Sequence, residues 1–130
     1  MKKIIFYSVG AINVMLGVFH IFFWKLFNWA EELSKISREN RGILQIANII
    51  LIFIIFYFAV MSFIMAKHRK IDIYAKSILI CASGFYLIRL VTGYMFFGSS
   101  IAELIISIIC ALVIIGYIFV LLGSARNARA

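Results

Sequence analysis

Four apolar stretches, each about twenty residues long, constrain this chain more than any other feature of its sequence. They cover residues 4–24, 43–66, 77–97 and 101–122. An α-helix needs roughly 20 apolar residues to cross a hydrocarbon core of about 30 Å. The apolar positions show no strict two-residue alternation, which argues against a β-barrel, and helices satisfy their own backbone inside lipid. We therefore predict an all-α, polytopic membrane protein, a four-transmembrane-helix bundle.

Composition agrees with this fold class. The 130 residues are 65% hydrophobic and 14% charged, with no proline and a mean hydropathy of +1.11, which lies outside the range of soluble domains. The chain has no low-complexity linker, so we predict a single domain over residues 1–130. The first stretch follows two lysines, as a secretory signal would. It is longer than a signal's apolar region and lacks a small-x-small cleavage site, so we expect it to be retained as a span.

The placement of lysine and arginine predicts the orientation, because cytoplasmic loops collect these residues. Eight of them lie on one side of the membrane, in the two terminal segments and in the connection between the second and third spans. Four lie on the other side, in the connection between the first two spans, where three glutamates partly offset them. Both termini are therefore expected in the cytoplasm. Topology and anionic headgroups explain the net charge of +8, so membrane lipids are the expected partners and no nucleic acid is needed.

The connection NWAEELSKISRENRG joins the first two spans. It mixes Trp29, Leu33 and Ile36 with charged residues, a pattern typical of a helix that lies in the membrane interface. We therefore predict a short interfacial helix here.

Small and polar residues recur at spacings of three and four inside each apolar stretch, which keeps them on one face of a helix. We expect these faces to point into the bundle and to leave Ile, Leu, Phe and Val for lipid. Plain helix packing would explain most of them, since Gly and Ala allow close approach and Ser or Asn bridges helices. The four stripes are Gly10, Asn13, Gly17, His20 and Trp24; Arg41, Gln45, Asn48, Ala59, Ser62 and Ala66; Ala75, Leu79, Ala82, Tyr86, Arg89 and Gly93; and Glu103, Ser107, Cys110 and Tyr117.

The polar residues are distributed unevenly with depth. The spans alternate in direction, and counting along them places most polar residues in the outer half of the bundle. Arg89 lies eight residues before Phe97, or about 12 Å along a helix that rises ~1.5 Å per residue. This asymmetry predicts a polar pocket open to the extracytoplasmic side. The candidate ligand-binding residues are Arg89, His20, Glu103, Gln45 and Asn48, with Trp24 and Tyr86 as walls.

Arg89 needs a partner, because a charge at the centre of a span costs about 2.5–3.5 kcal/mol on the mild insertion scale. Glu103 is the obvious counter-ion, since the short GSS connection makes the third and fourth helices antiparallel neighbours. In one interpretation the two form a buried ion pair, and His20, Gln45 and Asn48 complete a hydrogen-bond network. In the other, Arg89 binds the head of an anionic ligand and Glu103 or His20 exchanges protons or ligand.

Several chemistries are not expected, and we predict neither a cofactor nor a metal. Haem held by two histidines needs both on one ring, whereas His20 should lie near the outer surface and His68 beyond the inner end of the second span. The intramembrane His, Cys and Glu should lie at different depths, while a metal needs convergent ligands. The sequence has no phosphate loop, CxxC pair or Ser/His/Asp set. Cys81 and Cys110 are expected to be buried fillers, not disulfide partners.

The sequence favours a protein that binds or transports a small or amphipathic, anionic ligand. Two alternatives stay open. One is a membrane enzyme acting on a lipid or quinone-like substrate, with His20 and Glu103 as proton-transfer groups. The other is a structural subunit of a membrane complex. Enzymatic activity and assembly into a homo-oligomer both stay open as well.

The segments GVFHIFFWKLFNW and ENRGILQIAN resemble small bacterial four-span proteins, among them the DoxX-like group. The matching features are a histidine late in the first helix, here His20, an aromatic cluster after it, and an Asn-x-Gly start to the second helix, here Asn40 to Gly42. The likeness covers the first half of the chain and implies a four-helix bundle in a bacterial inner membrane. Some DoxX-like members look like subunits associated with redox enzymes, which implies a quinone or thiol context, although this chain has no redox cysteine pair.

Overall fold

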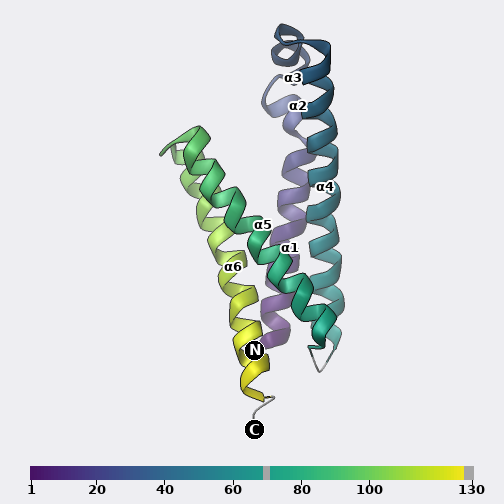
Figure 1. The fold of residues 1–130 in the computed structure, drawn as a ribbon, viewed down its shortest axis with the longest axis vertical. Coiled ribbons are helices and arrows are strands. Elements are labelled where there is room, and N and C mark those ends of the chain that lie inside the picture. Colours follow the sequence, from purple (N-terminus) through teal and green to yellow (C-terminus); the bar gives the residue numbers. More distant parts are fainter. Residues whose placement is uncertain (69–70, 128–130) are drawn as a thin grey trace. The chain divides into compact units, whose positions relative to one another are not determined.

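The chain is helical throughout the part that the computed structural model describes, residues 1–68 and 71–127 (Figure 1). Within these ranges there is no strand, so the predicted all-α class is confirmed. The elements are α1 (Lys2–Ile21), α2 (Phe23–Leu26), α3 (Trp29–Glu32), the 3-10 helix η1 (Leu33–Lys35), α4 (Arg38–Lys67), α5 (Ile73–Phe97) and α6 (Ile101–Asn127).

Four of these helices, α1, α4, α5 and α6, are long and apolar enough to cross a membrane, which is the pattern of a multi-pass membrane protein. The shortest of them, α1, has 20 residues, or about 30 Å of helix. Three predicted spans lie inside their helices. The first predicted span, 4–24, runs past the end of α1 at Ile21, because the helix is interrupted at Phe22 before α2 begins.

The chain divides into two compact units that are not continuous in sequence. We call Met1–Val9 together with Ser62–Ala130 the hairpin unit, because it contains α5 and α6. We call Gly10–Met61 the paired-helix unit, because it contains most of α1 and α4. Each of α1 and α4 therefore contributes residues to both units.

In the hairpin unit, α5 and α6 run antiparallel side by side, as the short connection predicted (Figure 1). The turn begins at Gly98, whose φ of 61° combined with ψ of −145° is a conformation that essentially only glycine adopts. The N–H of Gly98 donates to the carbonyl of Tyr94, which closes α5. Ser100 then caps α6, since its Oγ accepts the N–H of Glu103 at 3.2 Å.

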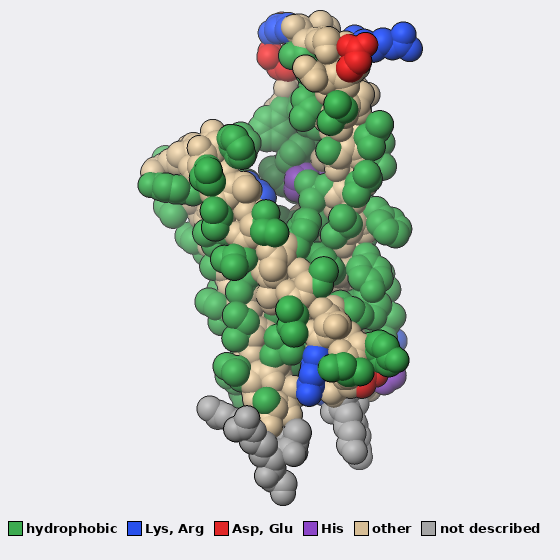
Figure 2. Space-filling view, in the orientation of Figure 1, with side chains coloured by type: hydrophobic (Ala, Val, Ile, Leu, Met, Phe, Trp, Pro, Cys, Tyr) green, Lys and Arg blue, Asp and Glu red, His purple; other side chains and the backbone are tan. Residues whose placement is uncertain are grey.

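The faces predicted to be interior are largely buried in this unit. On α5 the buried residues are Leu79, Ala82, Tyr86 and Gly93, all members of the predicted stripe. Exposed side chains on both helices are mostly apolar, and Figure 2 shows them covering the visible face of the hairpin. The prediction for Cys110 is confirmed, but the one for Cys81 is wrong: Cys81 is exposed, because it lies one position off the α5 stripe.

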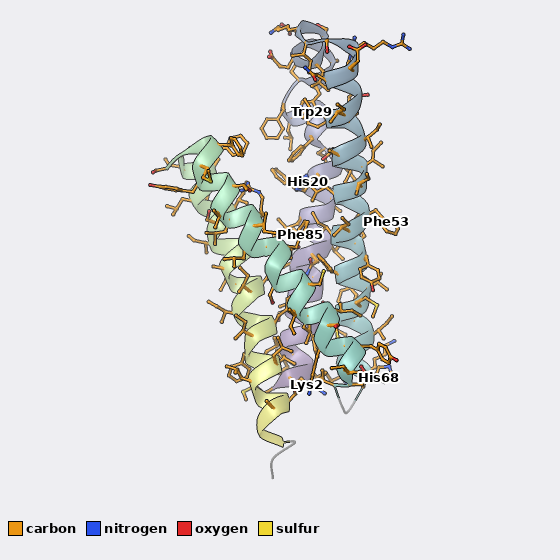
Figure 3. All side chains as sticks on the ribbon, in the orientation of Figure 1. Lys2, His20, Trp29, Phe53, His68 and Phe85 are labelled. Atoms are coloured by element: carbon orange, nitrogen blue, oxygen red, sulfur yellow. The ribbon has the colours of Figure 1, made fainter. Side chains whose placement is uncertain are left out.

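The ends of α1 and α4 meet in the hairpin unit. Lys2 donates from Nζ to the carbonyl of His68 at 2.9 Å, and Figure 3 shows the two residues together. A cation at this place complements the negative end of α4. Farther along, the rings of Tyr7 and Phe63 lie 6.1 Å apart.

In the paired-helix unit, α1 and α4 are antiparallel neighbours. A Cβ placed on Gly17 would lie 2.9 Å from the ring of Phe56, so the glycine allows the two helices to approach closely. One turn later on α1, His20 bonds to Asn48, which precedes Phe56 on α4. The paired residues therefore run in opposite directions along the two helices.

The predicted single interfacial helix is instead divided among α3, η1 and the first turn of α4. Asn28 adopts a left-handed conformation, with φ of 46°, and Ile36 is extended, so regular helix cannot run through either position. Charged side chains gather here, as Figure 2 shows. Lys35 donates to Glu32 at 2.7 Å, and this hydrogen bond raises the pKa of the lysine above its ordinary value.

Candidate functional site

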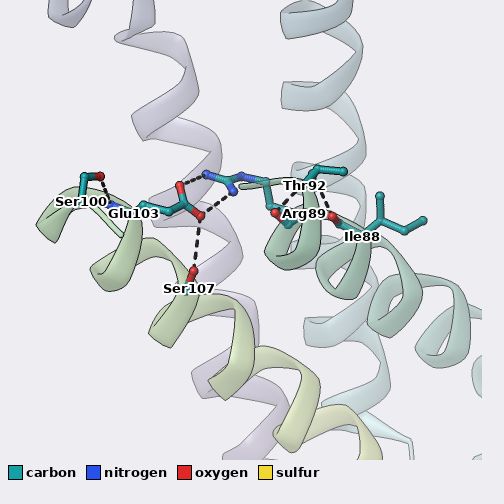
Figure 4. Close-up of polar contacts among 6 residues, drawn as sticks. All are labelled: Ile88, Arg89, Thr92, Ser100, Glu103 and Ser107. Atoms are coloured by element: carbon teal, nitrogen blue, oxygen red, sulfur yellow. Dashed lines mark hydrogen bonds and ion pairs between the residues drawn. The ribbon is translucent and has the colours of Figure 1, made fainter. Parts of the chain in front are cut away.

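Arg89 and Glu103 form a two-pronged ion pair between α5 and α6 (Figure 4). Nη1 of Arg89 donates to Oε1 of Glu103 at 2.9 Å, and Nη2 donates to Oε2 at 3.0 Å. The planar guanidinium fork matches both carboxylate oxygens, which makes this the strongest geometry for such a pair. The predicted counter-ion of Arg89 is therefore its actual partner.

Gly93 provides the space in which the pair sits. A Cβ at this position would collide with Nη1 of Arg89 and Oε1 of Glu103. The guanidinium carbon also lies 5.9 Å from the centroid of the Phe97 ring, within range of a cation–π contact. Gly93 and Phe97 are one and two turns after Arg89, so the long side chain runs along α5 toward the turn. An arginine within a span lowers the cost of burying its charge in this way, by extending its side chain toward the end of the helix.

Glu103 is more enclosed than its partner. Its side chain is 5% exposed against 29% for Arg89. Ser107, one turn later on α6, donates from Oγ to Oε1 at 3.3 Å, so three side-chain donors surround the carboxylate. Arg89 uses only two of its five N–H groups on Glu103, and within the described residues the structure gives the guanidinium no other hydrogen-bond partner.

A second polar pair lies in the hairpin unit, farther along α6 from the α5–α6 turn. The hydroxyls of Ser62 and Tyr117 are 2.8 Å apart, and both residues are buried. Both belong to predicted stripes, yet we did not select them as candidate site residues. Their positions in the stripes of small and polar residues were the one sign in the sequence that they face the interior. The candidate wall residue Tyr86 is also buried here, at 2% exposure.

His20 and Asn48 bond to each other twice in the paired-helix unit. Nδ1 of His20 lies 3.2 Å from Oδ1 of Asn48, and Nδ2 of Asn48 donates to the backbone carbonyl of His20 at 3.2 Å. Asn48 is buried and His20 half-buried. Gln45, one turn earlier on α4, is half-buried.

Aromatic rings pack around His20 and after it. The Phe23 ring is nearest, with its centroid 4.2 Å from the imidazole and the planes 34° apart. Phe23 in turn contacts Trp29, and Figure 3 shows His20 and Trp29 near the end of α1. Trp24 lies at the edge of this cluster and is 43% exposed; its ring centroid is 5.6 Å from that of Trp29. The aromatic cluster read from the sequence is therefore a packed one.

The seven candidate residues are divided between the two units. Arg89, Glu103 and Tyr86 belong to the hairpin unit. The paired-helix unit holds His20, Trp24, Gln45 and Asn48. Members of the set contact each other within each unit: Arg89 pairs with Glu103, and His20 bonds to Asn48. A single pocket shared by all seven stays a prediction.

No three His, Cys, Asp or Glu residues are grouped as metal ligands in the described ranges. No family model, curated protein or solved structure matches the chain. The resemblance to DoxX-like proteins stays a prediction.

Proposed function

We propose that this chain is a multi-pass protein of a bacterial inner membrane, with both termini in the cytoplasm, which binds or transports a small or amphipathic anionic ligand. Arg89 is the ligand's anchor in this proposal. The four candidate spans and the excess of lysine and arginine in the segments assigned to the cytoplasm support the location and orientation.

One observation carries the ligand proposal: the guanidinium of Arg89 is only partly used. Glu103 takes two of its five N–H groups, and 29% of the side chain is exposed. An ionisable residue within a span is costly and usually serves a function. The remaining N–H groups would suit the oxygens of a carboxylate or a phosphate, the two groups that guanidinium recognises best.

Glu103 has a different task in this proposal. Its carboxylate already accepts hydrogen bonds from Arg89 and Ser107, and its side chain is nearly fully buried. It holds the guanidinium in place and balances its charge while the spare donors face the ligand. A bound anion then adds to the pair without having to displace Glu103.

Native mass spectrometry in mild detergent tests the proposal. We would compare the wild type with the double variant Arg89→Met/Glu103→Leu, which removes both charges and leaves neither buried alone. Arg38→Gln, at the exposed start of α4, controls for loss of a surface arginine. We expect an anionic mass bound to the wild type and to Arg38→Gln, and lost from the double variant. The same mass on a folded double variant would refute the anchor role.

A structural role is the second candidate, and the completeness of the Glu103 contacts favours it. Three side-chain donors satisfy this carboxylate with no ligand present. If the pair serves only to fix α5 against α6, the wild type will carry no ligand in the same experiment. The double variant will then differ only in thermal stability or oligomeric state.

A further inference from the structure

Asn48 makes two hydrogen bonds to one residue, and together they determine the protonation of that residue's ring. Its amide Nδ2 lies 3.2 Å from the backbone carbonyl of His20, and its Oδ1 lies 3.2 Å from the ring Nδ1. A backbone carbonyl only accepts hydrogen bonds, so the NH2 end of the amide must face it. The oxygen end of Asn48 must then face the imidazole.

The same logic passes from the amide to the ring. An amide oxygen also only accepts, so Nδ1 of His20 must carry the proton in this contact. A neutral imidazole has a proton on one nitrogen alone, and the other keeps its lone pair. Nε2 is therefore the basic nitrogen of neutral His20.

The carbonyl that orients Asn48 is available because of where α1 ends. His20 is the penultimate residue of α1, and the last four carbonyls of a helix lack intrahelical donors. The Phe22 N–H is shared between the carbonyls of Val18 and Phe19, and Asn48 supplies the donor for His20. The close approach at Gly17 lets a side chain as short as asparagine reach across from α4.

Apolar contacts hold the ring in this orientation. Phe23 lies against the imidazole, with centroids 4.2 Å apart, and Phe19 packs edge-on at 5.8 Å. This packing fixes the plane of the ring, and the hydrogen bond to Asn48 selects which edge faces α4, because a half-turn of the ring would put the carbon Cδ2 opposite Oδ1 of Asn48 in place of Nδ1. The tautomer and the direction of Nε2 are thus set together.

We propose that Asn48 is a positioning residue that holds neutral His20 in its Nδ1–H form, which makes Nε2 the hydrogen-bond and proton acceptor of this cluster. This inference goes beyond the anion anchor at Arg89 and does not depend on it.

Nitrogen NMR of protein labelled with ¹⁵N-histidine tests the proposal. The chain has two histidines, so His68→Gln leaves His20 alone in the spectrum. An unprotonated imidazole nitrogen resonates far downfield of a protonated one, and couplings to the ring protons tell Nδ1 from Nε2. Above the pH at which His20 loses its charge, we expect a protonated Nδ1 and an unprotonated Nε2. An Nε2–H ring in the wild type would overturn the proposal without any variant being needed.

Two variants of Asn48 separate positioning from mere folding. Asn48→Leu keeps the approximate size but removes the acceptor, so we expect His20 to lose its Nδ1–H preference. Asn48→Asp keeps an acceptor opposite Nδ1, and the Nδ1 proton should remain. An unchanged tautomer in folded Asn48→Leu would refute the role. If that variant does not fold, loss of the Nδ1 proton in Asn48→Asp would refute it instead. His68, in protein that retains both histidines, reports an exposed ring as an internal reference.

Discussion

Arg89 and Glu103, fourteen residues apart in the chain, join α5 to α6 through two parallel hydrogen bonds of 2.9 and 3.0 Å. This contact explains how a permanently charged side chain is accommodated within the stretch 77–97 of α5, which carries no other charge. The guanidinium extends over Gly93 toward the end of α5, where a carboxylate near the start of α6 meets it. The charge is thus neutralised inside the hairpin.

Removal of one charge should cost far more than removal of both. Arg89→Met or Glu103→Leu alone leaves an uncompensated charge, which costs about 3–5 kcal/mol in buried pairs. The double variant should be less destabilised than either single variant, which requires a coupling larger than one single loss, above about 3 kcal/mol. Unfolding free energies in detergent for all four proteins give this value. Additive losses would mean that the two side chains do not interact.

Gly93→Ala should disturb the ion pair directly. Its Cβ would enter the space that Nη1 of Arg89 and Oε1 of Glu103 occupy, and overpacking of this kind costs about 1–3 kcal/mol. Gly84→Ala is the matched control on the same helix, because nothing lies within 4 Å of its added Cβ. Thermal unfolding of both should show a loss for Gly93→Ala alone. Equal midpoints would contradict the proposed placement of the pair.

Tyr117→Phe tests the buried hydroxyl pair. It removes the oxygen that lies 2.8 Å from Oγ of Ser62, and we expect a loss of about 0.5–1.5 kcal/mol, typical of one net hydrogen bond. Tyr74→Phe is the control, since Tyr74 is 78% exposed. Chemical unfolding curves compare the two variants. A loss in Tyr74→Phe as large as that in Tyr117→Phe would show that burial of the pair is not responsible.

The proposed orientation predicts which connections can be labelled from outside the cell. In a variant with Cys81 and Cys110 replaced by alanine, Ser99→Cys lies in the exposed α5–α6 turn, and Lys67→Cys lies at the exposed end of α4. A membrane-impermeant maleimide should label Ser99→Cys in spheroplasts, in which the inner membrane is intact. Lys67→Cys should react only after that membrane is permeabilised. The reverse pattern would invert the topology.

The sequence alone was enough for the helical class, the four candidate spans and the interior face of α5. Leu79, Ala82, Tyr86 and Gly93 were predicted from spacing and are buried, because a helix in any surroundings returns to the same face every three or four residues. The pairing of Arg89 with Glu103 could also be predicted. A three-residue turn brings the two helices together, and an internal charge needs a partner.

The tertiary structure decided what spacing along one helix cannot express. The two hydrogen bonds between Asn48 and His20 and the contact of Ser62 with Tyr117 each depend on how two helices face each other. The backbone conformation of single residues could not be predicted from the sequence pattern either. The left-handed Asn28 starts, and the extended Ile36 divides, a segment that its amphipathic composition predicted to be one helix. Periodicity reports which side of a helix is apolar, whereas hydrogen bonds between helices depend on their rotation and separation, which only packing in three dimensions determines.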